Sequence, residues 1–567
     1  MRRRDFDSKA ATALHSKSLI GRILAARGLR EESELELRLD ALLRPFDMAD
    51  YDHGVEILCQ AVQAGKRILV VGDYDADGAT STALACHALR AMGATAEYLV
   101  PNRFEYGYGL SPAIVKVALE KSPDLILTVD NGIASHDGVA LARAAGIQVV
   151  VTDHHLPGAT LPDADAVVNP NRADCAFGSK NLCGVGVIFY VVAGVCRQLQ
   201  NSGYLSAESA PRMADYLDLV ALGTVADVVP LDRNNRIFIE QGLRRIRAGA
   251  ARPGLLALFS VASRDHRQAT STDIGFVVGP RLNAAGRLDD MSIGIECLLA
   301  PTLGKAMPLA RQLDEFNRKR RQIESTMRQD GQQQVEQAAA GLPGDLPFAI
   351  TVYDPQWHEG VIGILAGRLK EQCHRPVFAF ARTHDGTLKG SGRSIAGIHI
   401  RDILVAIVAD HPDLLSKFGG HAMAAGLSLP EAHLPLFKEA FNRHVENVLG
   451  GRFPQREWLT DGALIDTEMT LENAVAIKYL QPWGQSFPAP QFDDIFEITE
   501  VRPVGNGHSR LRLCQPGGKR QFPAIAFNRQ ISGDESQRWH LVYRLDVNTY
   551  NNRESLQLVV EHLAPAP

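Results

Sequence analysis

Short apolar runs alternate with amphipathic segments over residues 51–302. Runs such as RILVV, LILTV and QVVVT are almost entirely apolar, and segments whose apolar residues recur at helical spacing lie between them. Strands buried on both faces read as continuous apolar runs, and strand–helix alternation is typical of a parallel sheet. We therefore expect an α/β domain whose parallel sheet is covered by helices on both faces.

Acidic and imidazole side chains stand where the apolar runs end. They follow the three runs above and a fourth, LDLVALGTVA, which we also interpret as strand-like. These residues are Asp73, Asp75, Asp77, Asp130, Asp153, His154, His155 and Asp227. The carboxyl ends of parallel strands share one edge of a sheet, where ligands bind. Carboxylates gathered there repel one another unless a cation neutralises them. The pattern predicts a metal-dependent hydrolase.

The first acidic cluster has a regular spacing. Asp73, Asp75 and Asp77 occupy alternate positions, so a locally extended backbone would point them to the same side. Carboxylates with one or two imidazoles suit a pair of hard divalent ions, Mn²⁺ or Mg²⁺, better than zinc. Simpler interpretations stay open. A lone aspartate such as Asp130 or Asp227 is often a helix N-cap. D-x-D-x-D-G also resembles a calcium-loop start, although residue 84 is Leu where such a loop needs Glu.

The pattern changes several times along the rest of the chain. Amphipathic, charge-rich segments predict a helical prefix at 1–50, and the long charged segment 303–341 predicts a connecting helix. A second α/β unit is expected at 342–448. Five short β-rich runs separated by turn signals predict a small barrel of the oligonucleotide-binding type at 449–567. The expected fold is therefore an α/β multidomain protein.

Composition limits the classes of protein to which the chain can belong. A chain of 567 residues is too long for one core, and its net charge of −5 gives no global signature of nucleic-acid binding. The eight cysteines form no C-x-x-C pair, so we expect them to be reduced. No run approaches the roughly 18 apolar residues of a membrane span, and no apolar segment follows the basic N-terminus. We expect a cytoplasmic protein with no membrane association.

Several motifs together resemble one family. DYDADGATST (73–82), TVDNGI (128–133), DHH (153–155) and ALGTVADVVPL (221–231) are similar to the DHH phosphoesterase superfamily, and PRLNAAGRL (280–288) to its RecJ family of exonucleases. WHEGVIGILAGRL, SGRS and FGGHAMAAG look like the associated DHHA1 domain. The resemblance spans nearly the whole chain. It departs at PWGQSFPAP (482–490), where the family generally has a GxGNPxP-like entry to the last domain.

The resemblance implies an activity and a set of ligands. It implies two-metal hydrolysis of phosphodiester bonds in single-stranded DNA from a 5′ end, in DNA repair and recombination. Asp75, Asp77, Asp130, His154 and Asp227 are then the expected metal ligands and catalytic residues. Asp73 is an additional metal-binding group, and His155 is a catalytic residue that contacts the scissile phosphate or protonates the leaving oxygen. Asp153 could orient a histidine.

Other residues are candidates for holding the DNA. Arg393 lies between Ser391 and Ser394 in SGRS, and Gly392 there lets the backbone approach an anion, so this segment is expected to read the terminal phosphate. We interpret FGGHAMAAG, with His421, as a glycine-rich entry to a helix. The further phosphate or base contacts that we expect are Arg103, Arg281, Arg287 and His358, with Phe104, Tyr106 and Tyr108 as stacking residues. Ordinary turns, packing corners and core aromatics are the alternatives.

Two other functions compete with the exonuclease. One is a DHH phosphodiesterase for short oligonucleotides or cyclic dinucleotides, but such enzymes are smaller. The other is a non-catalytic DHH scaffold of a replication assembly, which has no chemical need for the carboxylates and His154. An exonuclease for single strands needs unwound DNA, so single-stranded-DNA-binding protein and a helicase are expected partners. The separate domains and the connecting helix are compatible with a monomer.

Overall fold

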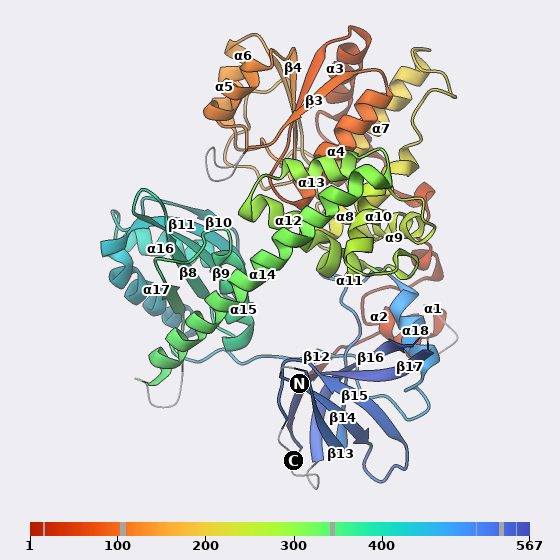
Figure 1. Cartoon of the computed structure of the whole chain (residues 1–567), viewed down its shortest axis with the longest axis vertical. Coiled ribbons are helices and arrows are strands. Elements are labelled where there is room, and N and C mark those ends of the chain that lie inside the picture. The colour runs from red at the N-terminus through yellow and green to blue at the C-terminus, as the bar shows by residue number, and fades with distance from the viewer. Residues whose placement is uncertain are drawn as a thin grey trace. The chain divides into compact units, whose positions relative to one another are not determined.

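The structure is a computed structural model of the chain (Figure 1). It describes residues 1–14, 18–101, 109–340, 346–505, 507–531, 538–551 and 553–566. The chain forms two compact units. The first comprises Met1–Gly286, Asp290–Asp314 and Trp458–Pro567, and the second comprises Arg287–Asp289 and Glu315–Glu457. The predicted α/β multidomain fold is confirmed, and each unit is described by itself below.

The first unit contains the expected parallel sheet. Its strand order is β3-β2-β4-β5-β6, and every pair is parallel. The strands are β2 (Arg67–Val71), β3 (Thr95–Leu99), β4 (Leu125–Val129), β5 (Gln148–Thr152) and β6 (Ala166–Val168). All five residues of β4 are buried, which explains why its sequence reads as an unbroken apolar run.

Helices cover both faces of this sheet. On one face α5 (Pro112–Glu120) and α6 (His136–Ala144) pack against the strands through one apolar cluster, which includes Val71, Val115 and Val139. On the other face lie α3 (Tyr51–Gln63), α4 (Ala76–Ala91) and α7 (Gly184–Asn201). Figure 1 shows α5 and α6 on one side of the strands and α3 and α7 on the other. The loops after β2, β4 and β5 therefore emerge together at one edge.

A helical layer follows the sheet in the sequence. It contains α8 (Leu217–Ala226), α9 (Arg233–Arg247), α10 (Pro253–Val261), α11 (Ser271–Asp273), a π-helical turn (Ile274–Val278), α12 (Gly279–Leu288) and α13 (Ser292–Leu299). The strand that we predicted from LDLVALGTVA is wrong, because this segment is α8. Every residue from Leu217 to Thr224 is buried. A helix without a polar face loses the periodicity that would distinguish it from a strand.

The N-terminal segment is helical as predicted, with α1 (Ser8–Leu14), α2 (Ser18–Ala25) and three 3₁₀ turns. It also contributes a short strand, β1 (Arg2–Arg3), that pairs in parallel with β12 (Leu459–Thr460). Nearby, Arg27 donates to Asp461 at 2.7 Å, and both side chains are only 1% exposed. The first residues of the chain are thus joined to the segment that leads into the C-terminal barrel.

The second unit is built on a mixed sheet of order β10-β11-β9-β8-β7. Its strands are β7 (Ile350–Tyr353), β8 (Val377–Arg382), β9 (Thr387–Arg393), β10 (Lys417–Gly420) and β11 (Ala424–Pro430). Helices α15 (Ile362–Cys373), α16 (Ile400–Asp410) and α17 (Leu434–Leu449) accompany them. The predicted connecting helix is α14 (Leu303–Ala340); it begins in the first unit and continues in the second.

The glycine-rich segment FGGHAMAAG does not enter a helix, so that prediction is wrong. It forms the β10–β11 hairpin, in which Gly420 pairs with Ala425. Gly420 has φ +149, and a Cβ there would lie 2.5 Å from the Ala424 oxygen. The small residues allow close strand pairing, whereas in the sequence the alanines resemble the start of a helix.

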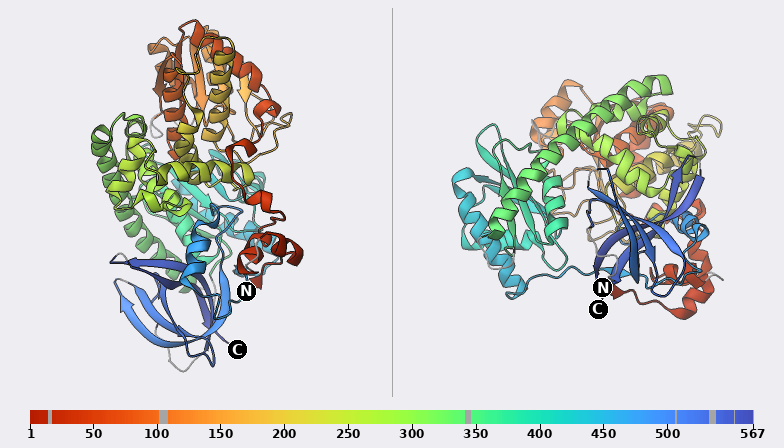
Figure 2. Two further views of the ribbon diagram at one scale, coloured as in Figure 1. Left: turned by 90° about the vertical axis from the view of Figure 1, so that its right-hand side faces the viewer. Right: turned by 60° about the horizontal axis from the view of Figure 1, so that its bottom comes forward.

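Five strands form the predicted C-terminal barrel. They are β13 (Phe492–Val504), β14 (His508–Cys514), β15 (Gln521–Ala526), β16 (Arg538–Tyr550) and β17 (Arg553–Pro565), and they close in the order β13-β14-β15-β17-β16 (Figure 2). The helix α18 (Leu471–Leu480) packs on β16 and β17.

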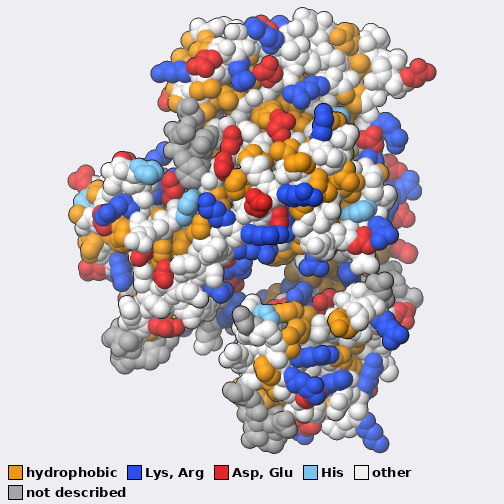
Figure 3. Space-filling model, viewed as in Figure 1, with side chains coloured by type: hydrophobic (Ala, Val, Ile, Leu, Met, Phe, Trp, Pro, Cys, Tyr) orange, Lys and Arg blue, Asp and Glu red, His pale blue; other side chains and the backbone are white. Residues whose placement is uncertain are grey.

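The surface in Figure 3 carries interspersed acidic and basic side chains. Among the described residues, no helix is long and apolar enough to cross a membrane.

Candidate metal centre

The loop between β2 and α4 carries the first three aspartates. Asp75 is the N-cap of α4, and its Oδ1 accepts a hydrogen bond from the Gly78 amide at 3.0 Å. Asp77 lies in the first turn of this helix and is 1% exposed. The locally extended backbone that we predicted across Asp73, Asp75 and Asp77 is therefore wrong, because the helix begins at Ala76. A Cβ at Gly78 would overlap the backbone of Asp73, so the turn requires glycine.

The N-terminus of α7 holds the carboxylate of Asp77. The amides of Gly184 and Val185 donate to its two oxygens at 2.6 and 2.9 Å. Amides in the first turn of a helix have no partner within that helix, so they are available for a carboxylate. A Cβ at Gly184 would lie 2.5 Å from the Cβ of Asp130. The missing side chain lets α7 begin between Asp77 and Asp130.

Asp130 follows β4 in a left-handed backbone conformation. Its φ is +61, which is unusual for a residue other than glycine and costs of the order of 1 kcal/mol. The Asn131 side chain supports the turn by donating to the carbonyls of Val71 and Val129 at 3.0 and 2.9 Å. Asn131 was not predicted as a site residue, although the TVDNGI motif contains it. The turn places the Asp130 carboxylate, 1% exposed, at the edge of the sheet.

Asp153 is a buried hydrogen-bond acceptor for its neighbours. Its Oδ2 accepts from the Ile133 amide at 2.9 Å. Its Oδ1 accepts from the His154 and His155 amides at 2.7 and 3.0 Å and lies 2.8 Å from Nδ1 of His155. Asp153 therefore fixes the ring of His155 and the backbone of both histidines, which agrees with the orienting role expected for it.

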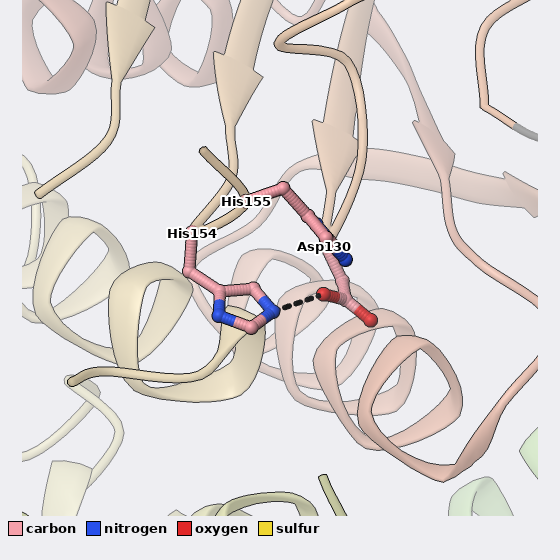
Figure 4. Close-up of side chains that lie close together, drawn as sticks. All are labelled: Asp130, His154 and His155. Atoms are coloured by element: carbon pink, nitrogen blue, oxygen red, sulfur yellow. Dashed lines mark ion pairs between the residues drawn. The ribbon is translucent and has the colours of Figure 1, made fainter. Parts of the chain in front are cut away.

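His154 points into the carboxylate cluster. Its Nε2 lies 3.1 Å from Oδ1 of Asp130 (Figure 4), 3.5 Å from Oδ2 of Asp227 and 3.9 Å from Oδ2 of Asp77. This nitrogen is buried, and among the described residues it makes no hydrogen bond. Asp227 reaches the cluster from the C-cap of α8 and not from a strand end. One buried nitrogen thus faces three carboxylates from three different segments.

Three groups of side chains bring potential ligand atoms within 4.8 Å of one another. They are Asp130, His154 and His155; Asp77, His154 and Asp227; and Asp73, Asp75 and Asp130. The second and third groups share no residue. The structure therefore brings together all the acidic and histidine side chains that the sequence predicted as metal ligands.

The electrostatics of the cluster favour a cation. Burial and the charge of Asp75 raise the pKa of Asp77 to about 7. Burial and the neighbouring aspartates raise the pKa values of Asp130 and Asp227 well above their usual range. Burial and His155 lower the pKa of His154 to about 4, so this ring is neutral and can act as a ligand. The unpaired His154 nitrogen and the carboxylate donors fit hard divalent ions.

His155 differs from its neighbour. Burial alone would lower the pKa of His155, but its hydrogen bond to Asp153 and the surrounding aspartates raise that pKa to about 9. Its side chain is 35% exposed. At neutral pH this ring keeps both protons, so it is suited to donating a proton or to contacting an anion.

The PRLNAAGRL motif packs against the loop that carries Asp73, Asp75 and Asp77. Oδ1 of Asn283, in α12, accepts a hydrogen bond from the Ala76 amide at 2.8 Å. A Cβ at Gly286 would overlap the carbonyl oxygen of Tyr74. Arg281 donates to Oδ1 of Asp314 at 3.0 Å and to the Val277 carbonyl, and it is 9% exposed. Asn283 was not predicted from the sequence, because only the charged residues of this motif stood out as candidates.

The remaining candidate DNA contacts of the first unit are Arg281 and four residues of the segment that follows β3. Arg103, Phe104, Tyr106 and Tyr108 lie outside the described residues. The observed contacts of Arg281 lie within the protein, and its expected phosphate contact stays a prediction.

The second unit contains a small polar site at the start of α15. Nη1 of Arg393 lies 3.3 Å from Oγ of Ser391. A Cβ at Gly363 would lie 3.2 Å from Nη2 of Arg393, so this glycine makes room for the guanidinium. Burial lowers the pKa of Arg393. Within the described residues Arg393 forms no ion pair with a carboxylate. A cation of this kind beside a helix N-terminus suits a phosphate.

Three more predicted contacts lie in this unit. Nδ1 of His358 accepts from the Gly360 amide at 3.0 Å, and Arg287 donates to the Gly360 carbonyl at 3.1 Å. His421 is exposed in the turn of the β10–β11 hairpin. The roles predicted for these residues in DNA binding stay predictions.

Sequence profiles match most of the chain. The DHH family, N-terminal domain, matches residues 67–224. The DHHA1 domain matches residues 345–447, and the RecJ OB domain matches residues 460–562. The three matches are in the chain order of the parallel sheet, the mixed sheet and the barrel.

Whole-chain comparisons find similar proteins. The chain is 48% identical to the single-stranded-DNA-specific exonuclease RecJ of Salmonella typhimurium and 47% identical to that of Escherichia coli. Each alignment covers 100% of this chain and 99% of the relative. The crystal structure of RecJ from Thermus thermophilus in complex with Mn²⁺ is 29% identical, with a TM-score of 0.81, over 99% of this chain and 78% of that one. The corresponding Mg²⁺ complex gives 28% and 0.74, over 99% and 76%.

Proposed function

Because the chain belongs to the RecJ family of DHH phosphoesterases, we propose that it is a metal-dependent exonuclease that hydrolyses phosphodiester bonds of single-stranded DNA. The observation that carries this proposal is the buried cluster of carboxylates around Nε2 of His154. The relatives of nearly equal length named as single-stranded-DNA-specific exonucleases support the substrate. The related structures with Mn²⁺ and with Mg²⁺ support the cofactor.

Two divalent ions, when bound, supply the activation of water and the charge stabilisation that phosphodiester hydrolysis requires. The side chains proposed to hold them are Asp73, Asp75, Asp77, Asp130, His154 and Asp227. The amides at the start of α7 fix Asp77, and Asn131 and Asn283 fix the turns that present the other aspartates. The protein thus orients the ligands before an ion or substrate arrives.

His155 is proposed to act on the substrate. Asp153 holds its ring, and the raised pKa keeps it protonated at neutral pH. It can therefore donate a hydrogen bond to the scissile phosphate or a proton to the leaving oxygen.

The Arg393 site is proposed to bind the terminal phosphate of the strand. Its guanidinium has no carboxylate partner among the described residues, and the start of α15 adds backbone amides. Recognition of a 5′ phosphate would set the 5′-to-3′ direction. Replacing Arg393 by Ala should weaken the preference for 5′-phosphorylated over 5′-hydroxyl strands. Arg443→Ala, at an exposed arginine of the same unit, should leave the preference unchanged.

A substrate panel tests the function. The protein is incubated with 5′-labelled and 3′-labelled single strands, a duplex and a dinucleotide, with Mn²⁺, Mg²⁺ or EDTA. We expect early release of the 5′ label from long single strands, and only with metal. Hydrolysis of the dinucleotide alone would favour the small phosphodiesterase, and no hydrolysis would favour the scaffold. Early release of the 3′ label would reverse the proposed direction.

The cellular setting is also part of the proposal. We propose a cytoplasmic monomer that degrades strands exposed by a helicase, in DNA repair and recombination, together with single-stranded-DNA-binding protein. The need for unwound DNA supports these partners. Light scattering during size-exclusion chromatography would test the monomer, since a dimer would double the mass of 61.8 kDa.

A further inference from the structure

A polar cavity lies in the first unit, at the ends of α4 and α8 that are opposite to Asp77 and Asp227. Its volume is 380 Å³, and its polar lining is His87, Arg212, Asp215, Tyr216, Arg245 and Arg252. His87 stands near the end of α4, ten residues after Asp77. Tyr216 directly precedes α8, whose C-cap is Asp227. At 1.5 Å per helical residue, the cavity lies about 15 Å from the candidate metal centre.

The arginines make the cavity a site for an anion. Nη1 of Arg245 pairs with Asp215 at 3.0 Å and its Nη2 donates to the Ala250 carbonyl at 2.9 Å, while Arg252 lies over the Tyr216 ring at 4.5 Å. The Nε atoms of Arg245 and Arg252 are buried and make no hydrogen bond to any residue that the structure describes. Arg212 is exposed, and within the described part of the chain its side chain forms neither a hydrogen bond nor an ion pair. Its charge is available to a ligand.

The nearby carboxylates do not cancel this positive charge. Asp215 pairs with Arg245, and Asp218 lies beneath the cavity, 3.8 Å from Nε of Arg252. Burial raises the pKa of Asp218, which weakens its negative charge. Burial, Arg252 and Arg90 together lower the pKa of His87. Three guanidinium groups therefore face one partly buried and one fully buried carboxyl group, and guanidinium groups bind phosphate oxygens well.

The remaining wall suits a planar ring. His87 and Tyr216 form an edge-to-face pair with ring centroids 5.5 Å apart. Ala91, Pro211 and Pro253 add apolar surface beside them. The volume is near the lower end of the roughly 300–1,000 Å³ range of small-ligand sites, so it matches one nucleotide and not a strand.

We propose that this cavity binds a nucleoside monophosphate, with the phosphate on Arg212 and Arg245 and the base along the wall formed by His87 and the prolines. Hydrolysis of a strand one nucleotide at a time releases this class of molecule. The inference rests on the proposed function only for this source of the ligand. The binding itself follows from the cavity.

Calorimetry with deoxyadenosine monophosphate tests the proposal. The full chain is titrated in EDTA, so that no divalent ion recruits the phosphate to the candidate metal centre. We expect one molecule to bind per chain, more tightly than either inorganic phosphate or deoxyadenosine. Arg212→Ala and Arg245→Gln should each weaken binding about tenfold or more, because each removes a charged hydrogen-bond donor. Arg267→Gln, at an exposed arginine outside the cavity, should bind like the wild type.

Two further variants locate the binding. Asp77→Asn and Arg393→Ala should both retain it, because they alter the candidate metal centre and the terminal-phosphate site. Loss of binding in either variant would overturn the proposal, and so would unchanged binding in Arg212→Ala, a surface substitution that leaves the core intact. Absence of binding by the wild type at millimolar ligand would also overturn it. If the nucleotide binds as expected but the protein hydrolyses no single strand, the proposed function fails and the cavity proposal stands.

Discussion

Asp77 and Asp130 expose only 1% of their surface, although both belong to a cluster of like charges. Burial of an ionised carboxylate is unfavourable unless an opposite charge compensates for it. Burial and the neighbouring aspartates raise the pKa values of both carboxyl groups, which favours their protonated forms where no cation is bound. A divalent ion and protons therefore compete for the same oxygens.

This competition predicts how metal affinity changes with pH. The pKa of Asp77 is raised to about 7, so below pH 7 a proton must leave before this carboxylate can bind an ion. The apparent affinity for Mn²⁺ should therefore rise by about tenfold or more from pH 6 to pH 8. Calorimetry in buffers of different ionisation enthalpy would measure both the affinity and the protons released. A pH-independent affinity would contradict the account, and Asp77→Asn should show a shallower slope.

Single residues of the site could be predicted only where a charged or imidazole side chain directly follows an apolar run. Asp75, Asp77 and the DHH residues stand out because charge directly follows apolar runs. Asn131 and Asn283 do not, because an amide becomes significant only through the backbone groups that it contacts. Asp227 was predicted as a ligand from a wrong strand assignment, and the family resemblance supplied the better reason.

Among the secondary-structure elements, the contact between α4 and α8 determines the geometry of the metal centre. A Cβ at Gly223, in α8, would overlap Oγ1 of Thr80 and lie 2.7 Å from Oδ1 of Asp77. The two helices approach so closely because this side chain is missing. Asp77 and Asp227 are thereby held on the same side of the cluster.

Gly223→Ala should therefore lower both stability and hydrolysis. Overpacking of a close helix contact costs about 1–3 kcal/mol, and here it displaces a ligand of the centre. Urea unfolding and the rate of strand hydrolysis would measure the two effects. Gly304→Ala is the control, since a Cβ at Gly304 meets no atom within 4 Å and should leave activity unchanged. Equal behaviour of the two variants would refute the proposed role of the contact.

The elements were predictable where burial leaves a periodic or continuous pattern. Strands β2, β4 and β5 of the parallel sheet are buried on both faces and read as continuous apolar runs. The strands of the barrel are buried mainly on one face and alternate apolar with polar residues. The segments of α8 and of the β10–β11 hairpin were assigned wrongly. The first is buried on all sides, and the second is rich in small residues, so in both cases neighbours elsewhere in the chain decide the conformation.

In the whole molecule, the barrel belongs to the same compact unit as the parallel sheet. The pairing of β1 with β12 and the ion pair between Arg27 and Asp461 connect the start of the chain to the barrel segment. The order of the domains was visible as changes of composition. These connections were not, because partners more than 400 residues apart leave no local pattern.

Asp461→Ala should destabilise this unit. The substitution leaves the guanidinium of Arg27, 1% exposed, without its carboxylate, and breaking a buried pair costs about 3–5 kcal/mol. Chemical unfolding followed by circular dichroism would measure the loss. Asp40→Ala, which removes an exposed ion pair with Arg38, should unfold like the wild type. A wild-type unfolding midpoint for Asp461→Ala would show that the barrel segment is not coupled through this pair.

The proposed activity is hydrolysis of single-stranded DNA at the carboxylate cluster with the help of divalent ions. The most direct test compares nucleotide release from a single strand by the wild type and by Asp77→Asn, with Mn²⁺ or with EDTA, while strand binding is measured separately. We expect the wild type to release nucleotides with Mn²⁺ and not with EDTA. In Asp77→Asn the rate of release should fall by about a hundredfold or more, while the affinity for the strand is retained. Release in EDTA, or a wild-type rate for Asp77→Asn, would contradict the proposed activity.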